Sequence, residues 1–255
     1  MSILTAYHTD VGIKKKTNQD GLLLKTARTP KGQVGLFVVC DGMGGLSHGE
    51  LASATVIRGM SDWFDSEMPR IAKSEHIEED IQTELETCIK QLNEKILSYG
   101  ESEKVTLGTT VTALLIVHHK YYIVHIGDSR VYQISSTLTQ VTTDQTVVAR
   151  EVARGNLTEE QAKSDPRRNV LLQCVGATKD IKIAFSTGDL KEKTVFMLCS
   201  DGFYHQISEE ELVENFHPSK LTDEKQMKEK VIGLVELVKA RKEVDNISVV
   251  VAEVV

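Results

Sequence analysis

Short apolar runs rich in Val, Ile and Tyr recur along the chain, each bounded by Gly, Asp, Asn or Lys. Such runs are typical of β-strands. We expect strands at Leu22–Lys25, Val34–Cys40, Thr109–Val117, Tyr121–Ile126, Val131–Ile134, Ile181–Phe185, Val195–Cys199 and Ile247–Ala252. The run Val34–Cys40 is almost continuously apolar, which favours a strand covered on both faces or one inside a sandwich core.

Apolar residues at three- and four-residue steps predict three longer helices. These cover Gly49–Met68, Ile77–Ile96 and Met227–Val238. We expect Thr222 to cap the last helix alone, because Lys225 stands where a capping box needs an acid. Ser208 followed by Glu211 does match a capping box and predicts a short helix, and Leu157–Glu160 shows a further short helix signal.

The order of the expected elements is strands, two helices, strands, short helices, strands, a helix and a final strand. A doubly wound parallel sheet would alternate strand and helix regularly, so this order favours helices packed outside antiparallel sheets, an α+β fold. No stretch rich in Pro, Gly or Ser separates the elements, and no low-complexity block occurs. We therefore expect a single domain over residues 1–255.

Charge and apolar content exclude several classes of protein. The formal net charge of −7 argues against broad nucleic-acid binding, which requires a basic face. The N-terminus shows no signal peptide, and no apolar run is long enough to span a membrane. The four cysteines lack the spacing of a metal site, and we expect them to be reduced in a cytoplasmic protein.

One motif recurs, in which an apolar run reaches a small residue, then Asp, then Gly or Ser; it contains Asp41, Asp128 and Asp201. Asp20 and Asp245 also stand next to predicted strands. Taken singly, each site is explained by a turn. Taken together, five carboxylates meeting at the rim of a sandwich would repel one another unless a cation neutralised them. Oxygen ligands favour magnesium, manganese or calcium, whereas no His or Cys spacing favours zinc.

A pair of such ions that share one carboxylate can polarise a bridging water and present it in line with a phosphorus atom. This chemistry needs no activated Ser or Cys nucleophile, and the sequence has no G-x-S-x-G elbow. The aspartate pattern is therefore compatible with a metal-dependent phosphoester hydrolase.

The motifs of the chain, in order, are Thr17–Asp20, Asp41–Gly45, Gly49–Glu50, Ala52–Ser53, Gly108–Thr110, Gly127–Arg130, Gly155–Thr158, Arg168–Leu171, Ser200–Gly202 and Asp245–Ser248. This ordered set resembles that of the metal-dependent serine/threonine protein phosphatases of type 2C (the PPM family), in their compact bacterial form. The resemblance runs over residues 5–255. It implies a four-layer α-β-β-α sandwich, with two central antiparallel sheets flanked by helices and metal ions at one rim.

The resemblance also implies the ligands of two Mn2+ or Mg2+ ions. Asp41, Asp201 and Asp245 would hold the first ion. Asp20, Asp41 and the backbone carbonyl of Gly42 would hold the second, with Asp41 bridging the two. Asp41 and Asp201 would thus act directly in catalysis.

The resemblance also implies a third metal site and a flap, and at some positions the chain differs from the family pattern. Asp128 would contribute to a third, weaker metal site, but His205 stands where the family often has an acidic ligand, and it is either a proton donor or a structural histidine. Residues 142–168 would form a mobile flap beside the site. Met43 stands where many eukaryotic members have His, so water or another group would protonate the leaving group.

Lys15 stands where the family usually has the Arg that clamps the substrate phosphate. Lysine cannot form the bidentate fork of arginine, so we expect phosphate binding with weaker orientation. The alternative is that Lys15 belongs to a solvated basic turn.

The resulting hypothesis is a monomeric phosphatase that hydrolyses phosphoserine and phosphothreonine with a metal-bridging water, acting on the protein substrates of a serine/threonine kinase. One alternative is a phosphatase-like binding module without catalysis; the complete set of core aspartates disfavours it. Another is a nucleotide-dependent enzyme, because Asp41–Gly45 lies between a strand and a helix. That motif breaks the dinucleotide fingerprint at its third glycine, and no P-loop sequence occurs.

Overall fold

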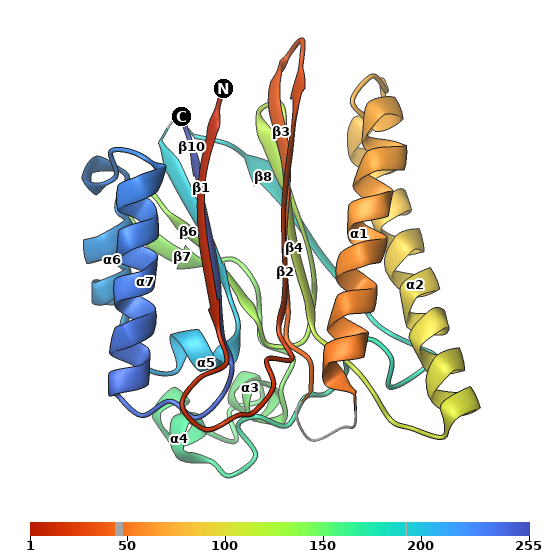
Figure 1. Cartoon of the computed structure of the whole chain (residues 1–255), viewed down its shortest axis with the longest axis vertical. Coiled ribbons are helices and arrows are strands. Elements are labelled where there is room, and N and C mark those ends of the chain that lie inside the picture. Colours follow the sequence, from red (N-terminus) through yellow and green to blue (C-terminus); the bar gives the residue numbers. More distant parts are fainter. Residues whose placement is uncertain (44–47, 192) are drawn as a thin grey trace.

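The computed structural model describes residues 1–43, 48–191 and 193–255. In this part of the chain, two five-stranded antiparallel sheets pack face to face with helices on both outer sides (Figure 1). The expected four-layer α-β-β-α sandwich of the α+β class is confirmed. Gly44 and Gly45, which belong to the second motif, lie outside the described residues.

The first sheet has the order β1 (Ile3–Asp10), β10 (Ile247–Val254), β9 (Thr194–Cys199), β6 (Arg130–Ile134) and β7 (Leu138–Gln140). The second has the order β2 (Gly21–Thr29), β3 (Gly32–Cys40), β4 (Val111–Val117), β5 (Lys120–Ile126) and β8 (Ala184–Asp189). The helices are α1 (Gly49–Ile71), α2 (Ile77–Glu103), α3 (Val147–Ala153), α4 (Glu159–Ser164), α5 (Asp201–Tyr204), α6 (Glu209–Phe216) and α7 (Glu224–Ala240), with a 3-10 turn at Pro218–Lys220.

The continuous apolar run of β3 is explained by burial on both of its faces. Leu36 and Val38 belong to the cluster beneath α1 and α2, whereas Phe37 and Val39 belong to the cluster between the two sheets. Because side chains alternate along a strand, a strand covered on both sides must be apolar at every position. Complete burial of each such side chain stabilises the fold by about 1.5–3 kcal/mol.

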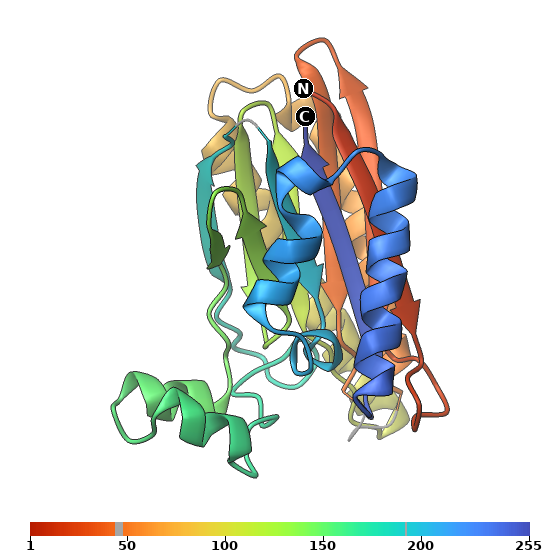
Figure 2. The ribbon, with the colours of Figure 1, turned by 90° about the vertical axis from the view of Figure 1, so that its left-hand side faces the viewer.

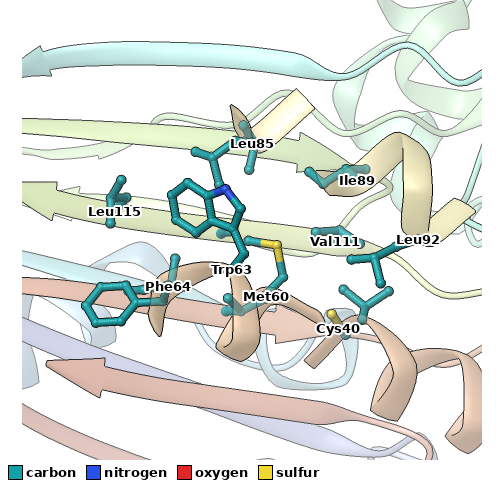
Figure 3. Close-up of a cluster of buried hydrophobic side chains, with 14 of the residues drawn as sticks. Cys40, Met60, Trp63, Phe64, Leu85, Ile89, Leu92, Val111 and Leu115 are labelled. Carbon is teal, nitrogen blue, oxygen red and sulfur yellow. The ribbon is translucent and has the colours of Figure 1, made fainter. Parts of the chain in front are cut away.

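The outer helices cover the sheets with the apolar stripes seen in the sequence. Figure 3 shows the cluster between the second sheet and its helices, with Met60, Trp63 and Phe64 of α1 facing strand residues and α2. On the other outer side, α7 buries Val231 and Val235 against the first sheet. None of the described helices combines the length and the apolar character that crossing a bilayer requires.

Several local expectations need correction. The strand expected at Ile181–Phe185 is β8, which begins at Ala184, paired with His125 of β5, and continues to Asp189. The N-cap of α7 is Asp223, not Thr222: the Asp223 carboxylate accepts the backbone N–H of Gln226 at 2.8 Å. A carboxylate one residue closer to the helix takes the capping role that a hydroxyl was expected to fill.

Two helix starts agree with the sequence. Ser208 and Glu211 form the expected capping box at α6. Thr158 caps α4 in a second capping box, with Gln161 as its partner. Together α3 and α4 form an arm that projects below the sandwich (Figure 2).

Candidate active site

Backbone pairing in the second sheet brings two aspartates to one edge. Gly21, the first residue of β2, pairs with Cys40, the last residue of β3. The adjacent Asp20 and Asp41 therefore leave the sheet side by side. The Asp41 backbone N–H is held by the hydroxyl of Thr110 at 2.8 Å, which orients the turn.

The first sheet contributes the other three aspartates in the same way. β9 lies between β6 and β10, and its end lies opposite their beginnings. Asp128 precedes β6, Asp201 begins α5 two residues after the end of β9, and Asp245 precedes β10. We call this edge the rim, and Asp20, Asp41, Asp128, Asp201 and Asp245 the rim aspartates. In Figure 1 the rim is the lower end of the sandwich, beside α3 and α5.

A hydrogen bond joins the rim across the two sheets. The Ser200 hydroxyl donates to Oδ2 of Asp20 at 2.9 Å, and the backbone N–H of Ser248 donates to the same hydroxyl at 3.0 Å. The other oxygen of Asp20, Oδ1, is enclosed and has no hydrogen-bond partner among the described residues. Oδ1 of Asp201 is in the same condition.

Burial and mutual repulsion both act on these carboxyl groups. Burial raises the pKa of Asp20 to about 7, and the charges of Asp201 and Asp245 add to the rise. Burial raises the pKa of Asp41 well above its usual range, and the charges of the four other rim aspartates contribute. The pKa of Asp128 is raised by burial and by Asp201. The five groups thus form one electrostatic unit.

The chemistry of the rim fits a hard divalent cation. Its side-chain donors are carboxylate oxygens, which magnesium and manganese prefer. Enclosed carboxylate oxygens without partners, such as those of Asp20 and Asp201, are costly unless a cation pairs with them. In the described ranges, no group of three or more His, Cys, Asp or Glu side chains is arranged so that it could hold a metal ion as it stands. The rim aspartates are close enough for their charges to affect one another, and like charges repel more strongly at short distance.

Close backbone approach holds the loop before β2 against the rim. The Asn246 side chain accepts the backbone N–H of Gln19 at 3.0 Å and donates to the carbonyls of Val11 and Thr17 at 3.0 and 3.1 Å. A Cβ on Gly12 would lie 2.2 Å from the Asp245 carbonyl oxygen, so only glycine fits there. Asn246 belongs to the last sequence motif, but its role in holding this loop was not predicted.

Lys15 lies on this loop and reaches the rim. Its Nζ atom is 2.7 Å from Oδ1 of Asp245, and both side chains are about one-third exposed. Burial alone would lower the pKa of Lys15, but its hydrogen bond to Asp245 and the charges of Asp245, Asp41 and Asp201 outweigh that effect and raise it. The lysine is therefore not part of a fully solvated basic turn.

His205 and Arg130 flank the rim on the side of Asp128. Nδ1 of His205 lies 3.9 Å from Oδ2 of Asp201, and its ring meets the ring of Tyr204 edge-on. The Arg130 guanidinium stacks on Tyr204 at 3.6 Å and makes a two-pronged ion pair with Asp144, with a shortest distance of 2.7 Å. Arg130 thus ties the beginning of the 142–168 segment to the rim, a role that the sequence did not reveal.

The raised pKa of Asp20 predicts a pH dependence of stability in metal-free protein. The group titrates at its usual 3.8 when unfolded and at about 7 when folded. The contribution of Asp20 to the free energy of unfolding is therefore fully present below the unfolded pKa. It is lost as the pH rises from there through the folded pKa, by about 4 kcal/mol in total. The amide of Asp20→Asn cannot ionise. In EDTA, the melting temperature of the variant minus that of wild type should therefore increase from about pH 4 to about pH 7.5. Asp62→Asn, the same change at an exposed position of α1, should show a constant offset; parallel profiles for Asp20→Asn would contradict the prediction.

Comparison with known proteins agrees with this geometry. The family profile described as Protein phosphatase 2C matches residues 12–238, most of the chain. The chain belongs to the protein phosphatase 2C family. The resemblance seen in the motifs is confirmed, and with it the enzyme class of serine/threonine protein phosphatases.

Relatives and solved structures of this family are similar over nearly the whole chain. The serine/threonine phosphatase stp of Listeria monocytogenes serotype 4b is 29% identical over 225 residues, which is 86% of this chain and 85% of the relative. The crystal structure of the Mycobacterium tuberculosis serine/threonine phosphatase PstP/Ppp has a TM-score of 0.84 and 29% identity, covering 100% of this chain and 99% of that one. The catalytic domain of PstP with two manganese ions has a TM-score of 0.81 and 28% identity, covering 99% and 98%.

Proposed function

We propose that this phosphatase is metal-dependent and hydrolyses phosphoserine and phosphothreonine in proteins by attack of a water that bridges two divalent ions. The observation that supports it most directly is the pair of enclosed, unpartnered carboxylate oxygens on Asp20 and Asp201, from opposite sheets of the sandwich. A rim whose side-chain ligands are all carboxylate oxygens, two of them without a hydrogen-bond partner, fits Mn2+ or Mg2+. Two manganese ions in the related PstP domain point the same way.

The proposed assignment of ligands is the one that the resemblance to the family implies. Asp41, Asp201 and Asp245 would hold the first ion, and Asp20, Asp41 and the Gly42 carbonyl the second. Asp41 suits the shared position because it interacts electrostatically with every other rim aspartate. Asp128, which interacts with Asp201, would serve a third and weaker site.

When bound, the ions would supply Lewis acidity toward the phosphoryl group and lower the pKa of the attacking water. The chain's own residues hold and orient this chemistry. Ser200 fixes the Asp20 carboxylate by a hydrogen bond, leaving its second oxygen free to face a cation. Lys15 stands at the rim with a cationic group for the substrate phosphate. Met43 has no proton to donate, so water or another group protonates the leaving alcohol.

We propose that residues 1–255 act as one domain, that 142–168 is a flap that tunes access to the rim, and that the protein works as a monomer in the cytoplasm. Its substrates would be phosphoproteins made by a serine/threonine kinase. The Arg130–Asp144 ion pair at the root of the flap supports a fixed hinge there.

Hydrolysis of matched phosphopeptides tests the proposal. Three peptides that differ only in carrying phosphoserine, phosphothreonine or phosphotyrosine are incubated with metal-stripped protein, with and without Mn2+ or Mg2+, and released phosphate is measured. We expect metal-dependent release from the first two and none from the third. Release that persists in excess EDTA, or its absence with either ion, would refute the mechanism. A melting temperature raised by ATP and not by Mn2+ would favour a nucleotide-dependent enzyme instead.

A further inference from the structure

A single lysine of the loop between β1 and β2 points at the rim. The loop carries three consecutive lysines, Lys14, Lys15 and Lys16. Lys14 and Lys16 are exposed, whereas Lys15 is half-buried. Its Nζ atom contacts Oδ1 of Asp245 at 2.7 Å. In Figure 1 this loop runs along the lower end of the sandwich, from β1 to β2.

The loop is built to bring Lys15 to this position. Its two ends, at Val11 and Thr17, are both held by the side chain of Asn246, the neighbour of Asp245. Gly12 packs so closely on the Asp245 carbonyl that a side chain there would collide with it. With both ends fixed to the segment that carries the carboxylate, the loop holds the ammonium group beside Asp245, and the pairing does not depend on a freely moving side chain.

The Lys15 ammonium group interacts with the same carboxylates that would bind the first metal ion. Besides Asp245, the charges of Asp41 and Asp201 act on Lys15. These three carboxylates are the ones that the proposed function gives to the first ion. Oδ1 of Asp245 also accepts the backbone N–H of Asn246 at 2.8 Å. With the ammonium and the amide both on Oδ1, this oxygen has little remaining capacity for a divalent ion.

We propose that Lys15 is an internal cation that competes with the first metal ion for Asp245, so that metal binding must displace its ammonium group. The inference rests on the proposed metal centre. In metal-free protein, Lys15 relieves the repulsion among Asp41, Asp201 and Asp245. On metal binding the two cations would repel, so the lysine has to move away from Oδ1, and the affinity of the first site is lower than the aspartates alone would give.

Titration calorimetry of Mn2+ into metal-stripped protein tests this directly. Lys15→Met removes the charge and keeps a flexible side chain of similar length. We expect it to tighten one of the Mn2+ sites by about five- to twenty-fold and to leave the other within about twofold. Lys14→Met, which removes the same charge from an exposed neighbour, should stay within about twofold of wild type at both sites. Lys15→Arg keeps a cation beside Asp245 and should remain within about threefold.

Thermal denaturation gives a second readout that does not depend on activity. In EDTA, Lys15→Met should melt about 2–4 °C below wild type, because the rim aspartates lose their counter-charge. In saturating Mn2+ the order should reverse. Equal Mn2+ affinities of wild type and Lys15→Met would overturn the inference and leave the proposed function standing. A wild type that binds no Mn2+ would overturn both.

Discussion

Asp41→Asn should lower the rate of Mn2+-dependent phosphopeptide hydrolysis by at least about a thousandfold, which corresponds to about 4 kcal/mol of lost transition-state stabilisation. The charges of all four other rim aspartates, which come from both sheets, act on the Asp41 carboxyl group. In the proposed mechanism it is the only ligand of both ions. An amide is neutral and cannot bridge two cations as a carboxylate does.

The fold should survive this substitution. Asn is the same size as Asp, and removing one member of a repelling group should raise the melting temperature in EDTA. Steady-state kinetics and thermal denaturation of the same preparation give both quantities. Asp62→Asn, at an exposed position of α1, is the matched control and should change neither. Near-normal turnover in Asp41→Asn would remove the bridging role from this residue.

Gly202→Ala should be damaging in a different way, by pushing apart two segments that each carry a rim aspartate. A Cβ at this position would lie 2.1 Å from the Asn246 carbonyl oxygen and 3.3 Å from the Asp245 Cβ. The first distance cannot be tolerated, so α5 and the segment before β10 must separate. We expect a loss of about 1–3 kcal/mol in the free energy of unfolding and at least a hundredfold loss in turnover, because small displacements of positioned groups are costly.

Gly233→Ala is the matched control for this prediction. Gly233 lies within α7, and a Cβ there would meet nothing within 4 Å. The same substitution should therefore stabilise the protein by about 0.5–1 kcal/mol and leave turnover unchanged. Urea denaturation with paired kinetic measurements separates the two cases. Full activity in Gly202→Ala would show that the contact of α5 with the Asn246 carbonyl does not position Asp201 and Asp245.

The strands and helices with strong apolar patterns were readable from the chain. β3 and β10 are apolar because both of their faces are covered, and the stripes of α1, α2 and α7 match the faces they bury. β1 was missed because it lies at the edge of its sheet and mixes polar and apolar residues along its length. α5 was missed because a helix of four residues is too short to show a periodic pattern.

For the site, local turn chemistry marked the aspartates, because an apolar strand that ends in Asp-Gly or Asp-Ser is visible in a few consecutive residues. Their meeting at one rim depends on the pairing of β2 with β3 and of β9 with both β6 and β10. The recurring pattern suggested that the aspartates converge at one rim, whereas their division into two ligand sets came only from the resemblance to a family. Asn246 and Arg130 belong to the sequence motifs, but nothing in the sequence showed which groups they hold in place.

The position of Lys15 is the clearest case of a feature decided in three dimensions. The chain showed a run of lysines, and the two interpretations considered were a phosphate ligand or a solvated turn. The ion pair with Asp245 joins residues from opposite ends of the chain, and it exists because Asn246 and Gly12 hold a loop against the strand that follows Asp245. Composition and periodicity report how each segment is buried, whereas the contact between two distant loops is set by the packing of the strands that carry them.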